Sequence, residues 1–223
     1  MESCGADGAA SGSGRGQSAE LVVDSLAFAR GPGLHAALII MTFGICWRIA
    51  VFALASPDRD IYWARKQFWL RRERRQIESY VMHAGLLTVL LGFSPHILLV
   101  RDLTGLGWPG LPIGLVWFAG AVTVITMVAV LLYRPAVERP RGLGAKLDEH
   151  FSWLVVFASL VTGLLAFPHL GGTSLTPPYA ALLTAHLLSA ELLMAWLPFG
   201  RLAHLALMPL LRGVRMLLRV RPR

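Results

Sequence analysis

Two histidines, His186 and His204, have the spacing in this chain that most directly suggests chemistry. They lie eighteen residues apart in a mostly apolar stretch. On an unbroken helix this spacing makes about five complete turns, so both imidazoles would project from one face, about 27 Å apart along the axis. That distance is close to the thickness of a bilayer's hydrocarbon core, about 30 Å. Because neutral imidazole ligates haem iron, the pattern predicts one potential haem ligand near each membrane surface.

The composition places these helices in a membrane. Of the 223 residues 55% are hydrophobic and 15% are charged, and the apolar residues are gathered in long runs. Helices satisfy their own backbone hydrogen bonds in lipid. We therefore expect an all-α fold, an integral membrane bundle of five transmembrane helices over residues 34–55, 80–100, 111–133, 151–167 and 179–199, the last continuing as a helix toward Met208.

The basic residues predict the orientation of the bundle. Outside the spans, 17 Lys and Arg fall on one side and three on the other. Basic residues accumulate on the cytoplasmic side, so the N-terminus is expected outside and the C-terminus in the cytoplasm. Residues 1–33 are expected to form a disordered extracytoplasmic tail, residues 34–208 the membrane domain and residues 209–223 a basic cytoplasmic tail. This arrangement of charge argues against nucleic-acid binding.

Two basic segments are expected to meet the cytoplasmic membrane surface. Residues 59–78 mix aromatic and basic side chains, as an interfacial helix does, and residues 212–223 are rich in arginine. Each segment either anchors the chain on lipid or forms a docking surface for a cytoplasmic subunit.

The second predicted span supplies partners for the first two histidines. It runs outward, with His83 near its inner end and His96 near its outer end, whereas the fifth span runs inward. His83 is therefore expected at the depth of His204, and His96 near that of His186. A histidine inside a membrane span is a functional-site hypothesis, because unpaired polar groups are unfavourable there.

The cysteines limit which cofactors the chain can hold alone. Cys4 lies in the tail and Cys46 in the first span, and the chain has no Cys-x-x-Cys motif. It therefore cannot build an iron-sulfur cluster by itself. Any such cluster would belong to a partner.

Four stretches carry a family resemblance: HLLSAELLMAWLPFGRLAHL at 186–205, HAGLLTVLLGF at 83–93, GICWR at 44–48 and GLLAFP at 163–168. Together they resemble the gamma subunit of respiratory nitrate reductases, a five-span cytochrome b with two haems between its second and fifth helices. The resemblance implies that His83 and His204 ligate an inner haem b and that His186 is one ligand of an outer haem. It also implies that Arg201 pairs with an inner haem propionate, although Arg201 could equally face lipid headgroups.

The chain departs from this family at the fourth ligand, where it has Phe93. On a straight helix His96 would point about 220° away from His83, and a kink at Pro95 could redirect it. The fourth ligand is thus His96, or His169 or His35 replaces it, or the outer haem is absent. The family's basic residue at the start of the third span is also missing, and Arg101 and Asp102 are the basic and acidic residues on that side that could serve quinol.

The resemblance implies a haem b subunit of a bacterial inner membrane. Such a subunit relays electrons between the quinone pool and an iron-sulfur subunit on the cytoplasmic side, and a separate catalytic subunit reduces the terminal substrate. The alternative is a haem-free or single-haem membrane anchor or assembly subunit of a respiratory complex.

Overall fold

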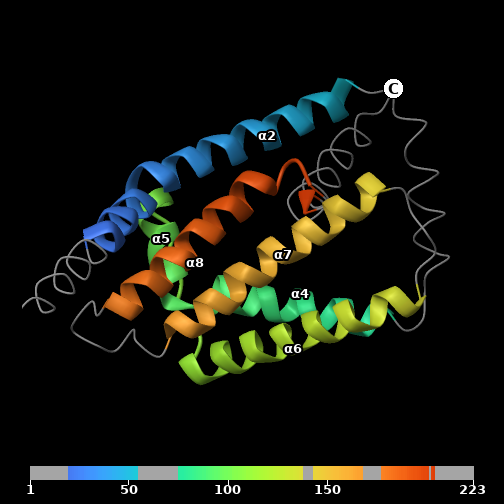
Figure 1. The fold of residues 1–223 in the computed structure, drawn as a ribbon. Coiled ribbons are helices and arrows are strands. Elements are labelled where there is room, and N and C mark those ends of the chain that lie inside the picture. Colours follow the sequence, from blue (N-terminus) through green and yellow to red (C-terminus); the bar gives the residue numbers. More distant parts are fainter. Residues whose placement is uncertain (1–19, 55–74, 138–142, 168–176, 201, 204–223) are drawn as a thin grey trace, which may run out of the picture. The chain divides into compact units, whose positions relative to one another are not determined.

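The computed structural model describes residues 20–54, 75–137, 143–167, 177–200 and 202–203, and these residues form helices and short connections without a strand (Figure 1). The helices are η1 (Ala29–Gly33), α2 (Leu34–Leu54), α4 (Arg75–Gly92), α5 (Ser94–Thr104), α6 (Ile113–Val137), α7 (Leu143–Ala166) and α8 (Pro177–Trp196). The expected all-helical class is therefore confirmed for the described part of the chain.

Four helices are long and apolar enough to cross a membrane. A fifth candidate is the pair Ile77–Gly92 and Ser94–Thr104, bent by 62°, if it forms one broken span. The other four are Glu20–Val51, Ile113–Leu132, Leu147–Ala166 and Tyr179–Trp196. An apolar helix of this length matches the hydrocarbon core of a bilayer, which agrees with a membrane protein.

The described part of the chain is already helical at residue 20, which corrects the expectation of disorder for residues 20–33. The buried positions of this first helix include Leu26, Ala29, Gly33 and Ala37, which recur every three or four residues and so share one helix face. That periodicity extends the apolar helix upstream of residue 34. The Gly and Ser content that suggested a tail is concentrated before residue 19.

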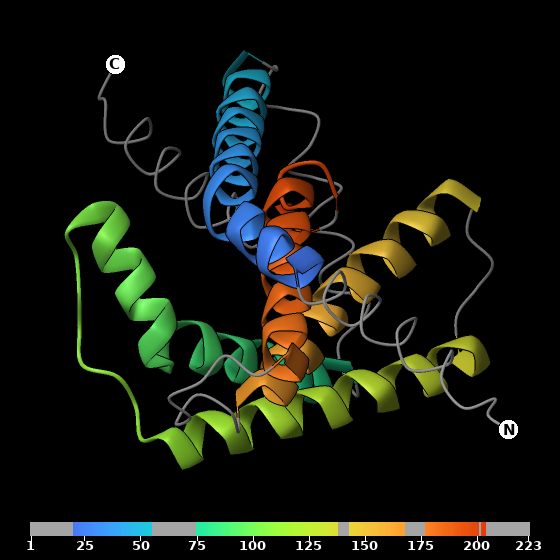
Figure 2. The ribbon, with the colours of Figure 1, turned by 60° about the vertical axis from the view of Figure 1, so that its left-hand side comes forward.

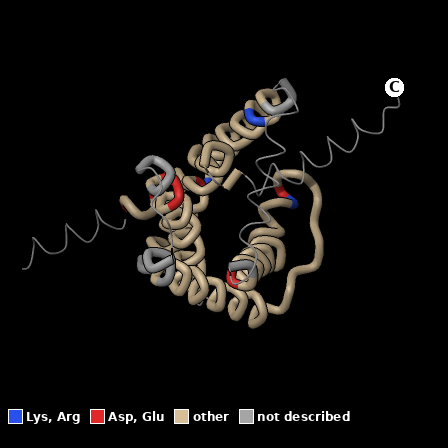
Figure 3. Tube along the Cα trace, turned by 90° about the vertical axis from the view of Figure 1, so that its right-hand side faces the viewer, with Lys and Arg blue, Asp and Glu red and all other residues tan. Residues whose placement is uncertain are grey.

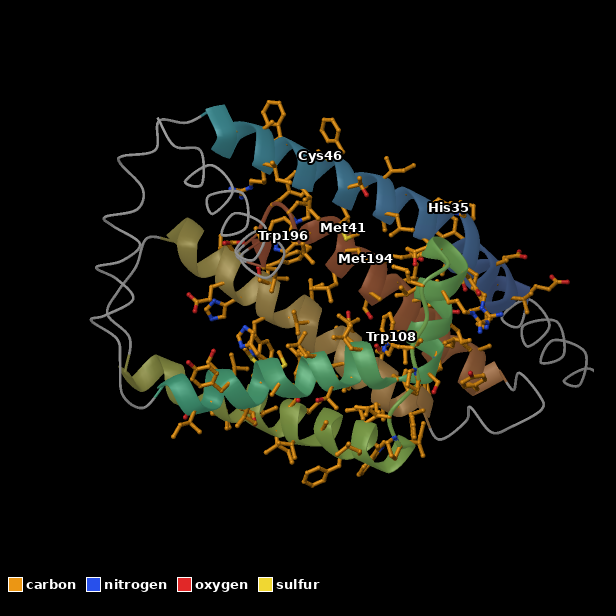
Figure 4. All side chains as sticks on the ribbon, turned by 180° about the vertical axis from the view of Figure 1, so that it is seen from behind. His35, Met41, Cys46, Trp108, Met194 and Trp196 are labelled. Carbon is orange, nitrogen blue, oxygen red and sulfur yellow. The ribbon has the colours of Figure 1, made fainter. Side chains whose placement is uncertain are left out.

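The described helices divide into two units. Unit one comprises Met1–Ala50 and Gly144–Arg223, and unit two comprises Val51–Leu143. In unit one, α8 lies between α2 and α7 (Figure 1). Small residues on the first helix allow close packing against α8, and Figure 4 shows Met41 of α2 and Met194 of α8 in the space between these two helices.

The end of α8 corrects the expectation that the last span continues as a helix toward Met208. The helix ends at Trp196, and residues 197–199 form a turn. Pro198 has no backbone N–H to continue the helix. The carbonyl oxygens of Pro198 and Phe199 instead accept hydrogen bonds of 3.0 Å from Nε and Nη2 of Arg48. The eighteen-residue spacing therefore does not translate into five regular turns.

Unit two is built on the packing of α4 against α6. The buried positions of α6 include Val116, Thr123 and Met127, which lie on one face of the helix. Gly85 of α4 sits directly against Thr123, and a larger residue there would collide with it. This close approach brings the backbones of the two helices together.

The bend between α4 and α5 confirms the expected break near Pro95. Phe93 is in an extended conformation, with φ of −82° and ψ of 120°, and Pro95 lies in the first turn of α5. Proline is compatible with a first helical turn but not with a helix interior. Figure 2 shows α5 leaving the direction of α4 at this point.

Candidate functional site

His186 is held against α7 by both a hydrogen bond and a close contact. Its Nδ1 lies 2.9 Å from the carbonyl oxygen of Ser159. On the same helix, a Cβ at Gly163 would stand 2.9 Å from Cε1 of the imidazole, so glycine is what leaves room for the ring. A carbonyl oxygen can only accept, so Nδ1 donates this hydrogen bond.

A short polar network surrounds this histidine at the α7–α8 interface. The hydroxyls of Thr162 and Ser189 lie 3.3 Å apart, and Ser189 Oγ donates to the carbonyl oxygen of His186 at 2.9 Å. Thr162 Oγ1 also donates to the carbonyl oxygen of Ser159 at 3.2 Å. The interface that fixes His186 is therefore polar within otherwise apolar helices.

His83 lies near the start of α4 and makes a similar contact with a backbone carbonyl. Its Nδ1 is 2.6 Å from the carbonyl oxygen of Ser79 and 3.3 Å from the hydroxyl of the same serine. Because the carbonyl oxygen can only accept, Nδ1 donates to it.

His96 lies on α5, beyond the bend. Its Nδ1 is 3.2 Å from the carbonyl oxygen of Val89, and its ring meets Phe93 edge-on with centroids 5.1 Å apart. Phe93 is thus both the residue at which α4 breaks and an aromatic neighbour of His96. His83 and His96 both belong to unit two, whereas His186 belongs to unit one.

The remaining candidate residues are either exposed or outside the described part of the chain. His35 is exposed on α2, and its Nδ1 donates to the carbonyl oxygen of Gly31 at 2.7 Å. His150 is exposed near the start of α7. His204, Arg201 and His169 lie outside the described residues.

The described histidines do not form a multidentate metal site. No group of three or more His, Cys, Asp or Glu side chains in the described ranges could hold a metal ion. Haem iron needs two axial protein ligands at most, because the porphyrin supplies the other four.

A pocket of about 610 Å³ opens in unit two at the α5–α6 connection. Ser94, Arg101 and Trp108 are among the residues that line it. Trp108 Nε1 donates to the carbonyl oxygen of Leu91 at 2.6 Å, and Figure 4 shows this tryptophan beside the end of α4. Arg101 also approaches Asp102, with Nε and Oδ1 3.8 Å apart and both side chains largely exposed. The volume is within the range of small-molecule pockets, about 300–1,000 Å³.

Glu191 is a notable polar residue that the sequence analysis missed. It is a buried carboxyl group in the second half of the apolar α8. An acidic residue inside a candidate span is itself a signal of a functional site, and this signal was present in the sequence.

The comparisons with known proteins give one relative. A protein of Nitratidesulfovibrio vulgaris strain Hildenborough, named only "Protein", is 29% identical over 145 residues, which are 65% of this chain and 61% of that protein. The match thus spans less than two thirds of the relative's length. No family model matches the chain. No solved structure matches it.

Proposed function

We propose that this chain is a haem b subunit of a bacterial inner membrane, similar to the gamma subunit of respiratory nitrate reductases. It relays electrons between the quinone pool and an iron-sulfur subunit on the cytoplasmic side, and a separate subunit performs the terminal catalysis. The N-terminus is outside, the C-terminus is in the cytoplasm, and five helices span the membrane.

The hydrogen bond from His186 Nδ1 to Ser159 is the observation that carries this proposal. Histidines that bind metals commonly donate one ring N–H to a carbonyl or carboxylate, which fixes the ring and leaves the other nitrogen as the ligand. Here the donor and acceptor come from different helices, and Gly163 leaves the space that the ring occupies. The residues present therefore fit an axial haem ligand.

The other proposed ligands follow the same chemistry. If the resemblance holds, His83 and His204 would hold an inner haem with Arg201 beside a propionate, and His186 and His96 would hold an outer haem. His83 and His96 each have a protonated Nδ1 against a carbonyl oxygen. When bound, haem supplies a one-electron couple that the side chains of this protein lack.

The pocket beside Arg101 is a candidate for the quinol site. The guanidinium of Arg101 is always charged and can donate hydrogen bonds to a ligand, and the ring of Trp108 lines the pocket. Arg101 lies on the predicted outer side of the membrane, and there it would take the place of the basic residue at the start of the third span in the nitrate reductase gamma subunits.

A haem-free or single-haem anchor subunit is the second candidate. Phe93 favours it, because the family's ligand position is here a phenylalanine at a helix break.

Haem counting with single variants tests these proposals. A reduced minus oxidised spectrum of the purified protein, expressed per chain, should show two b-type haems. His186→Ala should remove about half of the haem absorbance and His83→Ala the other half, since each supplies one axial ligand. Glu78→Gln, an exposed change on α4, should retain both haems. One haem in the unmodified protein would support the single-haem anchor, and none would overturn the relay.

A further inference from the structure

Glu191 is enclosed in the apolar interior of unit one. It lies within the candidate span Tyr179–Trp196, and the residue is only 8% exposed. Gly33 stands opposite on the first helix, where a Cβ would be 2.6 Å from Oε2 and 3.1 Å from Oε1 of Glu191. The absence of a side chain at Gly33 thus creates the space for the carboxyl group.

The elements around Glu191 offer it no counter-charge in the described part of the chain. Its Oε1 is buried and has no hydrogen-bond partner there. No titratable residue occurs on α7 between Phe151 and Ala166. On the first helix, Arg30 and His35 are exposed positions that flank the face of Gly33. On α8, the ring of His186 is directed to α7.

An ionised carboxylate in this position would be strongly unfavourable. Burying a carboxylate without a paired cation costs several kcal/mol, even after the surrounding protein has relaxed. A neutral carboxylic acid avoids most of this penalty. Acidic residues inside membrane spans accordingly pair with another group, face water, or take part in proton pathways.

The helix beside Glu191 is locally irregular. Residues Ala29–Gly33 form the π-helical turn η1, which contains Pro32. The α8 helix packs against this turn. Proline lacks the N–H that a helix would use, and π-helical turns occur frequently at functional sites. The regular α-helical hydrogen-bond pattern of the first helix is therefore interrupted at η1, next to the carboxyl group of Glu191.

We propose that Glu191 is a proton-binding site within the membrane domain, with the proton and water as its ligands. At neutral pH the side chain is a neutral carboxylic acid. When water reaches it beside η1, the carboxyl O–H bond breaks, a water molecule accepts the proton to form hydronium, and no electron is transferred. This site needs no haem and goes beyond the electron relay.

Infrared spectroscopy of the full chain in detergent tests the protonation state. At neutral pH the unmodified protein should show the C=O band of a protonated carboxyl group, and Glu191→Gln should lack that band. Glu78→Gln, which removes an exposed carboxyl group, should keep it. Transfer into deuterium oxide should shift the band, because the proton exchanges with water. A protein without the band, a band that persists in Glu191→Gln, or one that deuterium oxide leaves unshifted would overturn the proposal.

A second pair of variants tests whether the band arises from Glu191, without removing its carboxyl group. Gly33→Ala should shift the frequency of the band, since its Cβ would press on the carboxyl oxygens. Gly31→Ala should leave the band in place, because a Cβ there meets nothing within 4 Å. An unshifted band in Gly33→Ala would contradict the assignment even if Glu191→Gln failed to fold. Haem content does not enter these measurements, so failure here leaves the proposed function standing.

Discussion

In His83 and in His186, Nδ1 donates a hydrogen bond to a backbone carbonyl oxygen. For His83 the acceptor is four residues earlier on the same helix, an arrangement that any exposed helical histidine can adopt. For His186 the acceptor is on another helix and the ring fills the space above a glycine. At the residue scale, His186 is therefore the more constrained and the more informative of the two.

Gly163→Ala tests whether this constraint matters for binding. The new Cβ would lie 2.9 Å from Cε1 of His186, so the ring must move away from Ser159. We expect loss of the haem that depends on His186 and retention of the one that depends on His83, measured as haem per chain. Gly114→Ala is the control, because a Cβ at that glycine meets nothing within 4 Å. Full haem content in Gly163→Ala would show that Ser159 and Gly163 do not position a ligand.

Sequence reasoning reached the identity of the candidate residues but not their contacts. His83 and His186 stand out because a histidine in an apolar span is unusual, whatever surrounds it. The pairing of His186 with Ser159 depends on how α7 packs on α8, and nothing local encodes it. Glu191 was overlooked although its charge could be read directly from the stretch that contains His186.

At the scale of the helices, proline explains what was predictable and what was not. Pro95 predicted the break between α4 and α5 correctly, because a proline disfavours a continuous helix before it. The fifth span was expected to continue as a helix toward Met208, whereas α8 ends at Trp196. Pro198 has no backbone N–H to continue the helix, and Arg48 donates hydrogen bonds to the carbonyl oxygens of Pro198 and Phe199 beyond it. That tertiary contact is not visible in a linear pattern.

Arg48→Met should destabilise this end of unit one. The substitution keeps an unbranched side chain but leaves the carbonyl oxygens of Pro198 and Phe199 without their guanidinium donor. Hydrogen bonds to charged groups contribute about 1.5–3 kcal/mol when buried, and the partial exposure of this pair reduces that to about 1–2 kcal/mol. The measurement is the thermal unfolding midpoint in detergent. Trp47→Leu, at a neighbouring position that is 61% exposed, should change the midpoint less. Equal midpoints for Arg48→Met and the unmodified protein would contradict the capping role.

At the scale of the whole molecule, composition was sufficient to predict the class. Long apolar runs leave few alternatives to membrane helices, and four described helices qualify as spans on length and hydropathy. Figure 3 shows how few charged residues the described part contains. The number of spans was harder to predict, because α4 and α5 are individually short and the bend between them admits either one broken span or a re-entrant pair.

Cysteine labelling in intact cells decides between these two topologies and tests the orientation. In a background in which Cys4 and Cys46 are replaced by serine, Glu78→Cys probes the start of α4 and Thr104→Cys probes the end of α5; both positions are exposed. The excess of basic residues before α4 predicts that Glu78 faces the cytoplasm. If the bent pair is one span, a membrane-impermeant thiol reagent should label Thr104→Cys and spare Glu78→Cys, and permeabilised cells should label both. The reverse pattern would invert the orientation. Equal labelling of both positions in intact cells, or protection of both until permeabilisation, would place the two ends of the pair on one side and reduce the spans to four.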